Sequence, residues 1–241
     1  MPRTTPGNDP RAPVRRITAR SSIMHRLIFA LFLLATSSTA VWAADDFPYR
    51  SSLSFAAVRN GQTIGHHSLT FQKNGAQLTV STAIDLAVKF MGVTAYRYTH
   101  RAQEVWSGET FQGLTAQTDD DGKKYAIEIR RDGAALAIER NGRPDGAVRT
   151  TLPPQLLPST HWNVRQVRQS ALVNTQTGME VRVQVSVQGR EKIRTATASI
   201  DATRYRYTGD LVMDQWFDDA GRWVKTSFTA SDGSTIEYVL Q

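Results

Sequence analysis

The side chains best suited to contact a ligand gather on one expected strand. An extended strand over residues 95–106 places every second side chain on the same face. That face carries Tyr96, Tyr98, His100, Ala102, Glu104 and Trp106. His100 and Glu104 would lie roughly 13 Å apart along the strand, too far to act as a direct acid–base pair. The pattern indicates either the wall of a ligand cavity or a packed sheet face with aromatic pairs between strands.

A second group of such residues is the tripeptide His161-Trp162-Asn163. It follows a proline-rich stretch at a point where strand alternation fails. Functional residues often lie on loops that a rigid scaffold holds in place. We expect Trp162 to cover one end of a β-cavity, with His161 and Asn163 as polar contacts. The alternative is a structural plug in which Trp162 only anchors the segment.

The remaining polar clusters do not predict a metal or cofactor. His66 and His67 are adjacent, so a regular strand points them to opposite faces. Asp119-Asp120-Asp121-Gly122 lacks the alternating acids of a calcium loop and is typical of a solvated hairpin tip. No metal-binding His spacing occurs, and the chain has no cysteine to supply a thiolate. We therefore expect no metal and no cofactor.

Catalysis has little support in the sequence. The chain contains no Gly-x-Ser-x-Gly motif and no glycine-rich phosphate loop. Its carboxylates mostly lie beside expected turns. The sequence thus favours a protein that is not an enzyme and assigns no catalytic residue, although carboxylates brought together by folding would allow a hydrolase.

Strands must position these residues, because period-2 alternation dominates the chain from residue 49 onward. Asn-Gly and Asp-Gly pairs separate the apolar runs and signal hairpins. The clearest strands span 49–59, 63–72, 77–89, 93–106, 110–118, 123–131, 180–188, 193–200, 205–217, 222–230 and 234–240. Long, two-faced, hairpin-linked strands predict an all-β fold with one large, curved antiparallel sheet, as in a half-barrel or incomplete barrel.

The alternation has one long interruption, which covers residues 141–178. This stretch contains several prolines, and Ser159 or Thr160 can cap a short helix there. A long interruption in a compact β domain usually has a function or is disordered. We expect one short helical or irregular segment that covers an opening of the sheet.

The amino terminus reads as an export signal. Residues 24–43 combine a positive start, a short apolar run and small residues, and Val41 and Ala43 fit a cleavage site after Ala43. The apolar run is too short to span a membrane. Residues 1–23 form a polar extension that is not translated if synthesis starts at Met24. Residues 44–241 are then expected to be a single periplasmic β domain with no stable transmembrane anchor.

Composition limits the partners. The whole chain has a net charge of +7, but residues 44–241 carry 23 basic against 21 acidic side chains. A nucleic-acid-binding protein needs a concentrated basic patch, and none is visible. We expect no nucleic-acid partner, while the oligomeric state cannot be inferred.

Several motifs together resemble a known family. They span 59–71 (RNGQTIGHHSLTF), 88–106 (VKFMGVTAYRYTHRAQEVW), 116–125, 159–166, 173–178 and 216–238. As a series they resemble uncharacterised secreted proteobacterial proteins that are catalogued only as a domain of unknown function. The resemblance implies one periplasmic β-rich domain and carries no activity or catalytic residue. The expected architecture also looks like the half-barrel lipid and lipoprotein carriers of the periplasm, which is an analogy of fold alone.

Taken together, the residues predict non-catalytic binding of a lipid or other apolar or amphipathic ligand in envelope lipid or lipoprotein handling. The candidate contacts are Tyr96, Tyr98, His100, Trp106, His161, Trp162 and Asn163. Three alternatives remain open: an envelope structural or assembly factor that uses a sheet edge, a carboxylate-based hydrolase, and an integral outer-membrane barrel. An acid-free apolar cavity would favour binding, whereas converging acids or histidines would favour catalysis.

Overall fold

The fold is one large antiparallel sheet. The structure is a computed structural model, and it describes residues 47–142 and 146–241. The strands in these residues are β1 (Ser52–Arg59), β2 (Gln62–Asn74), β3 (Gln77–Phe90), β4 (Val93–Ser107), β5 (Thr110–Asp120), β6 (Lys123–Asp132), β7 (Ala135–Gly142), β8 (Gly146–Leu152), β9 (Leu157–Pro158), β10 (Ala171–Val173), β11 (Glu180–Arg194), β12 (Ser199–Gly209), β13 (Met213–Asp218), β14 (Trp223–Thr229) and β15 (Thr235–Leu240). The predicted fold class, an all-β protein with one curved antiparallel sheet, is confirmed.

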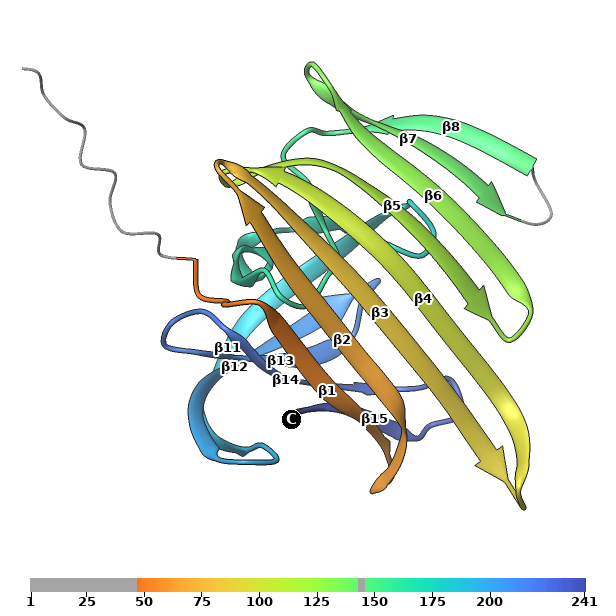
Figure 1. The fold of residues 1–241 in the computed structure, drawn as a ribbon, viewed down its shortest axis with the longest axis vertical. Coiled ribbons are helices and arrows are strands. Elements are labelled where there is room, and N and C mark those ends of the chain that lie inside the picture. The colour runs from red at the N-terminus through yellow and green to blue at the C-terminus, as the bar shows by residue number, and fades with distance from the viewer. Residues whose placement is uncertain (1–46, 143–145) are drawn as a thin grey trace, which may run out of the picture. The chain divides into compact units, whose positions relative to one another are not determined.

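The chain enters the sheet in its middle and leaves it there. The strand order is β8-β7-β6-β5-β4-β3-β2-β1-β15-β14-β13-β12-β11-β10-β9, and only β9 and β10 pair in parallel. The sheet is therefore unclosed within the described residues: β8 lies at one edge (Figure 1) and β9 lies at the other. Only four residues join these edge strands, so the chain crosses from one edge to the other over a short distance.

Three two-residue hairpin turns lie at the same end of the sheet. They are Asn60-Gly61, Met91-Gly92 and Asp121-Gly122, and all six residues have positive φ. Two successive positive φ angles define the turn that suits the right-handed twist of a hairpin. These turns fix the register of the long strands, as in the pairing of β3 with β4 from Gln77–Ser107 to Phe90–Val93.

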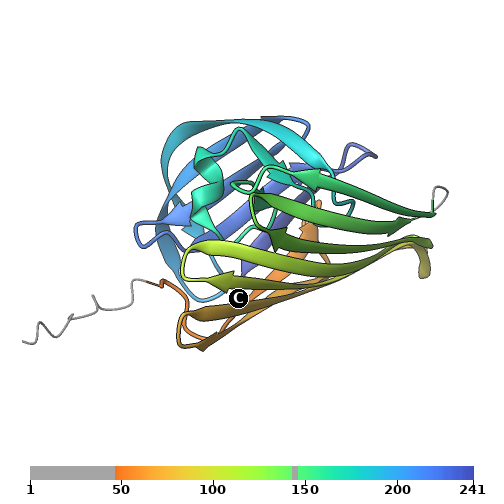
Figure 2. The ribbon, with the colours of Figure 1, turned by 90° about the horizontal axis from the view of Figure 1, so that it is seen from above.

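The segment after β8 fills part of the concave face. Residues 153–178 lie inside the curve of the sheet, between the green strands β5–β7 and the blue strands β11–β14 (Figure 2). Within it, a short 3-10 helix spans Val164–Arg168. The covering segment that the sequence predicted is therefore present.

Several predicted boundaries were wrong. The strands β7 and β8 were missed: the alternation in β7 is short, with Leu136 and Ile138 buried, and β8 is a largely exposed edge strand. The predicted cap at Ser159 or Thr160 is also wrong: the helix starts five residues later and Asn163 caps it. The Ser159 hydroxyl oxygen is used elsewhere, since it accepts from the Thr175 N–H at 3.3 Å. The predicted strand 205–217 is divided between β12 and β13 by a turn.

The predictions for the amino terminus cannot be compared with this fold, because residues 1–46 lie outside the described part of the chain. Within the described residues, no helix is both long and apolar enough to cross a membrane.

Candidate functional site: a cavity beside a packed core

The concave face holds a cavity of about 1140 Å³. Ligand sites for small molecules typically measure about 300–1000 Å³, so this one is large enough for a lipid-sized molecule. Turn residues of four hairpins lie at its rim: Phe90 from β3–β4, Asp121 from β5–β6, Val212 from β12–β13 and Ser231 from β14–β15. His67 and His161, in contrast, contact Trp223 of the core and form its inner end.

Strands β2 and β3 supply part of the apolar lining. The residues involved are Ile64, Leu69, Ile84, Leu86 and Val88. In a regular strand Ile64 and His67 would face opposite sides, yet both line the cavity. An irregularity in the β1–β2 pairing beside Gly65 changes the alternation. A side chain on Gly65 would meet the Asp85 carbonyl oxygen at 1.9 Å, so only glycine allows this close approach.

Strand β4 supplies a polar part of the lining. The Tyr96 hydroxyl donates to Asp120 Oδ1 at 2.7 Å, and the Tyr98 hydroxyl donates to Gln176 Oε1 at 3.2 Å. Gln176, from the covering segment, in turn donates to Asp120 Oδ2 at 3.3 Å. Together these contacts tie β4, β5 and the covering segment into one hydrogen-bonded group on the cavity wall.

Three histidines meet at the inner end of the cavity. The rings of His67 and His161 are 5.6 Å apart, and His100 also lines the wall. Burial lowers the pKa of His100 and of His161 to about 4, and burial with the two neighbouring histidines also lowers the pKa of His67 well below its ordinary value. All three rings are therefore neutral at pH 7.

Each histidine has a different hydrogen-bond environment. His161 Nδ1 lies 2.6 Å from Gln215 Nε2, and an amide nitrogen can only donate, so Nδ1 accepts. His100 Nδ1 lies 2.8 Å from the Thr118 hydroxyl. Neither ring nitrogen of His67 has a partner among the described residues. A buried polar group without a partner carries a free-energy cost, which makes His67 an unusual residue for a sheet interior.

The geometry gives little scope for catalysis. His100 and Thr118 are close enough for a base and a nucleophile, but Thr118 is buried and does not line the cavity. Across residues 47–142 and 146–241, no three His, Asp or Glu side chains are arranged to hold a metal ion. Neutral histidines and tyrosines can instead exchange hydrogen bonds with a ligand.

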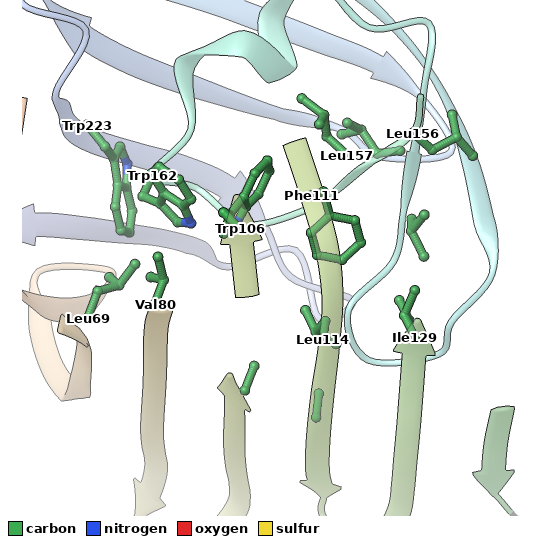
Figure 3. Close-up of a cluster of buried hydrophobic side chains, with 14 of the residues drawn as sticks. Leu69, Val80, Trp106, Phe111, Leu114, Ile129, Leu156, Leu157, Trp162 and Trp223 are labelled. Atoms are coloured by element: carbon green, nitrogen blue, oxygen red, sulfur yellow. The ribbon is translucent and has the colours of Figure 1, made fainter. Parts of the chain in front are cut away.

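The other end of the concave face is densely packed (Figure 3). Trp162 lies between the sheet and the covering segment, where its Nε1 donates to Glu104 Oε1 at 3.1 Å. Trp106 Nε1 donates to Glu104 Oε2 at 3.0 Å, and the two indole rings meet edge to face at 5.4 Å. Trp162 thus lies against the aromatic face of β4.

Glu104 is the centre of this packed end. Its side chain is fully buried, and burial raises its pKa to about 7 although the two indole N–H donors act in the opposite direction. Tyr49 fastens the segment from the other side, because its hydroxyl donates to the Trp162 carbonyl. The packed end is therefore closed by hydrogen bonds as well as by apolar contacts.

The structure separates the seven candidate residues into two sets. Tyr96, Tyr98, His100 and His161 lie on the cavity wall, whereas Trp106, Trp162 and Asn163 do not. The two tryptophans belong to the packed core, and the side chain of Asn163 accepts from the Arg165 N–H at the start of the helix. Trp162 is thus a plug rather than a lid.

Sequence reasoning missed other lining residues. His67 was considered only as a metal ligand, although it shares an alternating inward face with Leu69 and Phe71. Asp120 was interpreted only as part of a hairpin tip, and it reaches Tyr96 across the β4–β5 pair. Gln176 carried no signal, because the fold of the covering segment alone brings it to the wall.

The fold and the site define a β-barrel-like protein with an open cavity of ligand size. Residues 55–241 match the family described as Domain of unknown function (DUF6134), and the chain belongs to that family. The predicted resemblance to a domain of unknown function is confirmed. None of the curated proteins matches the chain.

The architecture is shared with a solved structure of another family. It is the crystal structure of a beta-barrel-like protein of a domain of unknown function, DUF1849, from Brucella abortus. The two are 9% identical with a TM-score of 0.53, and the match covers 79% of this chain and 94% of that chain. At this identity the likeness shows the fold alone.

Proposed function

We propose that this protein binds an apolar or amphipathic ligand, such as a lipid, without catalysis, and that it does so in the periplasm as part of envelope lipid or lipoprotein handling. The observation that carries the proposal is the cavity of about 1140 Å³ on the concave face. The proposed periplasmic location of the protein has separate support, namely the export signal expected at residues 24–43.

The chemistry of the lining favours an amphipathic ligand. Apolar side chains from β2 and β3 can contact a hydrocarbon chain, and burial of that chain supplies the driving force for binding. Hydroxyl groups and neutral rings from β4 and the covering segment can hydrogen-bond a polar group. A few convergent polar groups in an otherwise apolar cavity are typical of a site that orients its ligand.

The lining is not acid-free, which bears on the hydrolase alternative. Asp120, Asp121 and Asp232 belong to it, but each carboxylate already has a partner: Tyr96 and Gln176 for the first, the Arg97 N–H for the second and Arg59 for the third. Hydrolysis of a glycosidic bond by carboxylates usually needs two of them, one on each side of the bond that is cleaved. The histidines do converge, which by itself would favour catalysis. We still favour binding, because no carboxylate hydrogen-bonds to His67, His100 or His161 among the described residues.

Native mass spectrometry of protein purified without detergent from the envelope fraction of its own cells tests this proposal. We expect a lipid-sized adduct that is lost on denaturation. After refolding, incubation with a total lipid extract of the same cells should restore the same adduct. A bare chain that takes up no lipid from the extract would contradict the binding function.

The same sample tests the location. Amino-terminal sequencing of the periplasmic material should start at Ala44, because Val41 and Ala43 satisfy the small-residue rule. An intact Met24 start in washed membranes would contradict export with cleavage, and it would leave the binding proposal untouched.

A further inference from the structure

The tip of the β3–β4 hairpin is apolar and exposed. The side chains of Phe90, Met91 and Val93 are 70%, 88% and 70% exposed. Only three other large apolar side chains in the described residues are exposed, and each is less open to solvent than the tip: Met179, Val187 and Val212. Soluble proteins scatter such residues singly, whereas a cluster marks an interaction surface.

The two sister turns show that this composition is not required by the fold. Asn60 (φ 46°), Met91 (φ 51°) and Asp121 (φ 50°) occupy the same turn position with the same backbone angle. Asn and Asp tolerate a positive φ, whereas other side chains there strain the backbone. Met91 is therefore unfavourable both for the turn and for contact with water, and strain of this kind typically occurs at functional positions.

The tip also stands at the mouth of the cavity. Phe90 and Lys89 belong to the cavity lining as well as to the tip. The hairpin from 86 to 99 carries Lys89 and Arg97 but no acidic residue of its own, although Asp121 of the neighbouring turn accepts from the Arg97 backbone N–H. An apolar end flanked by cations matches the layering of an anionic lipid surface, with hydrocarbon below the headgroups.

We propose that the β3–β4 tip inserts into the surface of a phospholipid bilayer and so brings the cavity mouth to the membrane. The tip is a narrow convex projection, which suits a fluid surface better than the flat face of a protein. The inference goes beyond the proposed function, because the cavity can bind a ligand whether or not the tip docks on lipid.

The chain without cysteine allows a direct test with single labelled positions. Met91→Cys and Asn60→Cys variants of the processed protein each receive an environment-sensitive fluorophore. Phosphatidylethanolamine–phosphatidylglycerol vesicles should shift the emission of the Met91 label to the blue and leave the Asn60 label unchanged. Vesicles lacking phosphatidylglycerol should give a several-fold weaker response. No shift at either position, or equal shifts at both, would overturn the proposal.

A second variant separates docking from stability. Met91→Asn places the residue of the sister turn at the strained position, so the urea midpoint should stay the same or rise. Combined with Phe90→Ser, it should lower the bound fraction in vesicle flotation at least tenfold. Val187→Asn, at a 65% exposed position within β11, is the matched control and should float as the parent does.

Two further outcomes would count against a bilayer. Equal losses from Val187→Asn and from the tip variant would show general apolar adhesion. Self-association of the parent without vesicles, abolished by Met91→Asn, would make the tip a contact between copies of this chain. Either result would overturn only the docking of the tip on a bilayer. The proposed ligand binding is tested separately, by the lipid adducts in native mass spectra.

Discussion

The two ends of the concave face are built from the same strands but filled differently. At one end, Trp162 and Leu156 of the covering segment pack against β4 and β5. At the other end the same strands enclose the cavity. The strand β4 runs through both: Glu104 and Trp106 lie in the packed end, and Tyr98 and His100 lie on the cavity wall.

This difference shows that the alternation of a strand determines which of its faces points inward. It does not determine whether other side chains pack against that face or a cavity lies beside it. The packed end is filled because the covering segment places Leu156 and Trp162 there. At the cavity end, the covering segment contributes hydrogen-bonding side chains such as Gln176 at the wall. The packed end should therefore control stability, and the cavity should control binding.

The largest effect should come from removing the plug. Trp162→Ala should lower the free energy of unfolding by about 3–5 kcal/mol, because it empties a buried indole site and leaves Glu104 with one donor fewer. Urea unfolding measures this change. Trp162→Phe keeps most of the ring and should lose less, while a loss below about 1 kcal/mol for the alanine variant would show that the packed end is not the core.

The cavity end should weaken in acid. The unfolded chain protonates His100 below its ordinary pKa of 6.5, whereas the folded protein does so only near 4, so acid favours unfolding. Between about pH 7 and 4.5 this histidine alone should account for a loss of about 2.5 kcal/mol. His100→Gln, measured by urea midpoints across that range, should lose correspondingly less than the parent. Parallel curves would contradict a buried neutral ring.

The packed end should show the opposite pH dependence. Glu104 ionises at about 7 in the folded protein and near 4.5 in the unfolded chain, so rising pH favours the unfolded state between these values. The expected cost is about 2 kcal/mol between about pH 5 and 7. Glu104→Gln should remove this cost, and the variant should therefore lose stability more steeply on acidification than the parent. An unchanged pH profile would place Glu104 in a solvated site.

The smallest effects concern two threonines. The Thr82 hydroxyl is buried without a partner, so Thr82→Val should change stability by less than about 1 kcal/mol or raise it. The Thr118 hydroxyl is hydrogen-bonded to His100, so Thr118→Val should lower the free energy of unfolding by about 1 kcal/mol. The two variants are matched in shape, and thermal unfolding compares them. Equal losses would show that the Thr82 hydroxyl has a partner after all.

Much of the fold could be predicted because it follows from local patterns. The Asn60-Gly61 and Asp121-Gly122 turns and the long alternating strands β3 and β4 are visible in the sequence. The edge strand β8 could not be found in the same way, because most of its side chains are exposed and only Val148 and Leu152 are partly buried. A strand is recognised in a sequence by the alternation of apolar and polar residues. That alternation arises from the burial of one face, and an edge strand buries little of either face.

The site could be predicted only in part, for a physical reason. Alternation identified the inward face that carries Tyr98 and His100, and the break in the pattern identified His161. Nothing local shows that His67, His100 and His161 converge, since that depends on the pairing of β2 with β3 and β3 with β4. The Gly65 irregularity, which brings Ile64 inward, also depends on contact with a neighbouring strand.

The central claim is that the hollow end binds a ligand while the packed end does not. The most direct measurement is a fluorescence titration of the processed protein with a fatty acid that carries a fluorophore, for the parent, Leu86→Trp and Ala87→Trp. Leu86 lines the cavity, and Ala87 is its neighbour on the opposite face of β3. We predict saturable binding by the parent and by Ala87→Trp, and at least tenfold weaker binding by Leu86→Trp, all with similar urea midpoints. Equal affinity in the three proteins, or no saturable binding by the parent, would contradict the account.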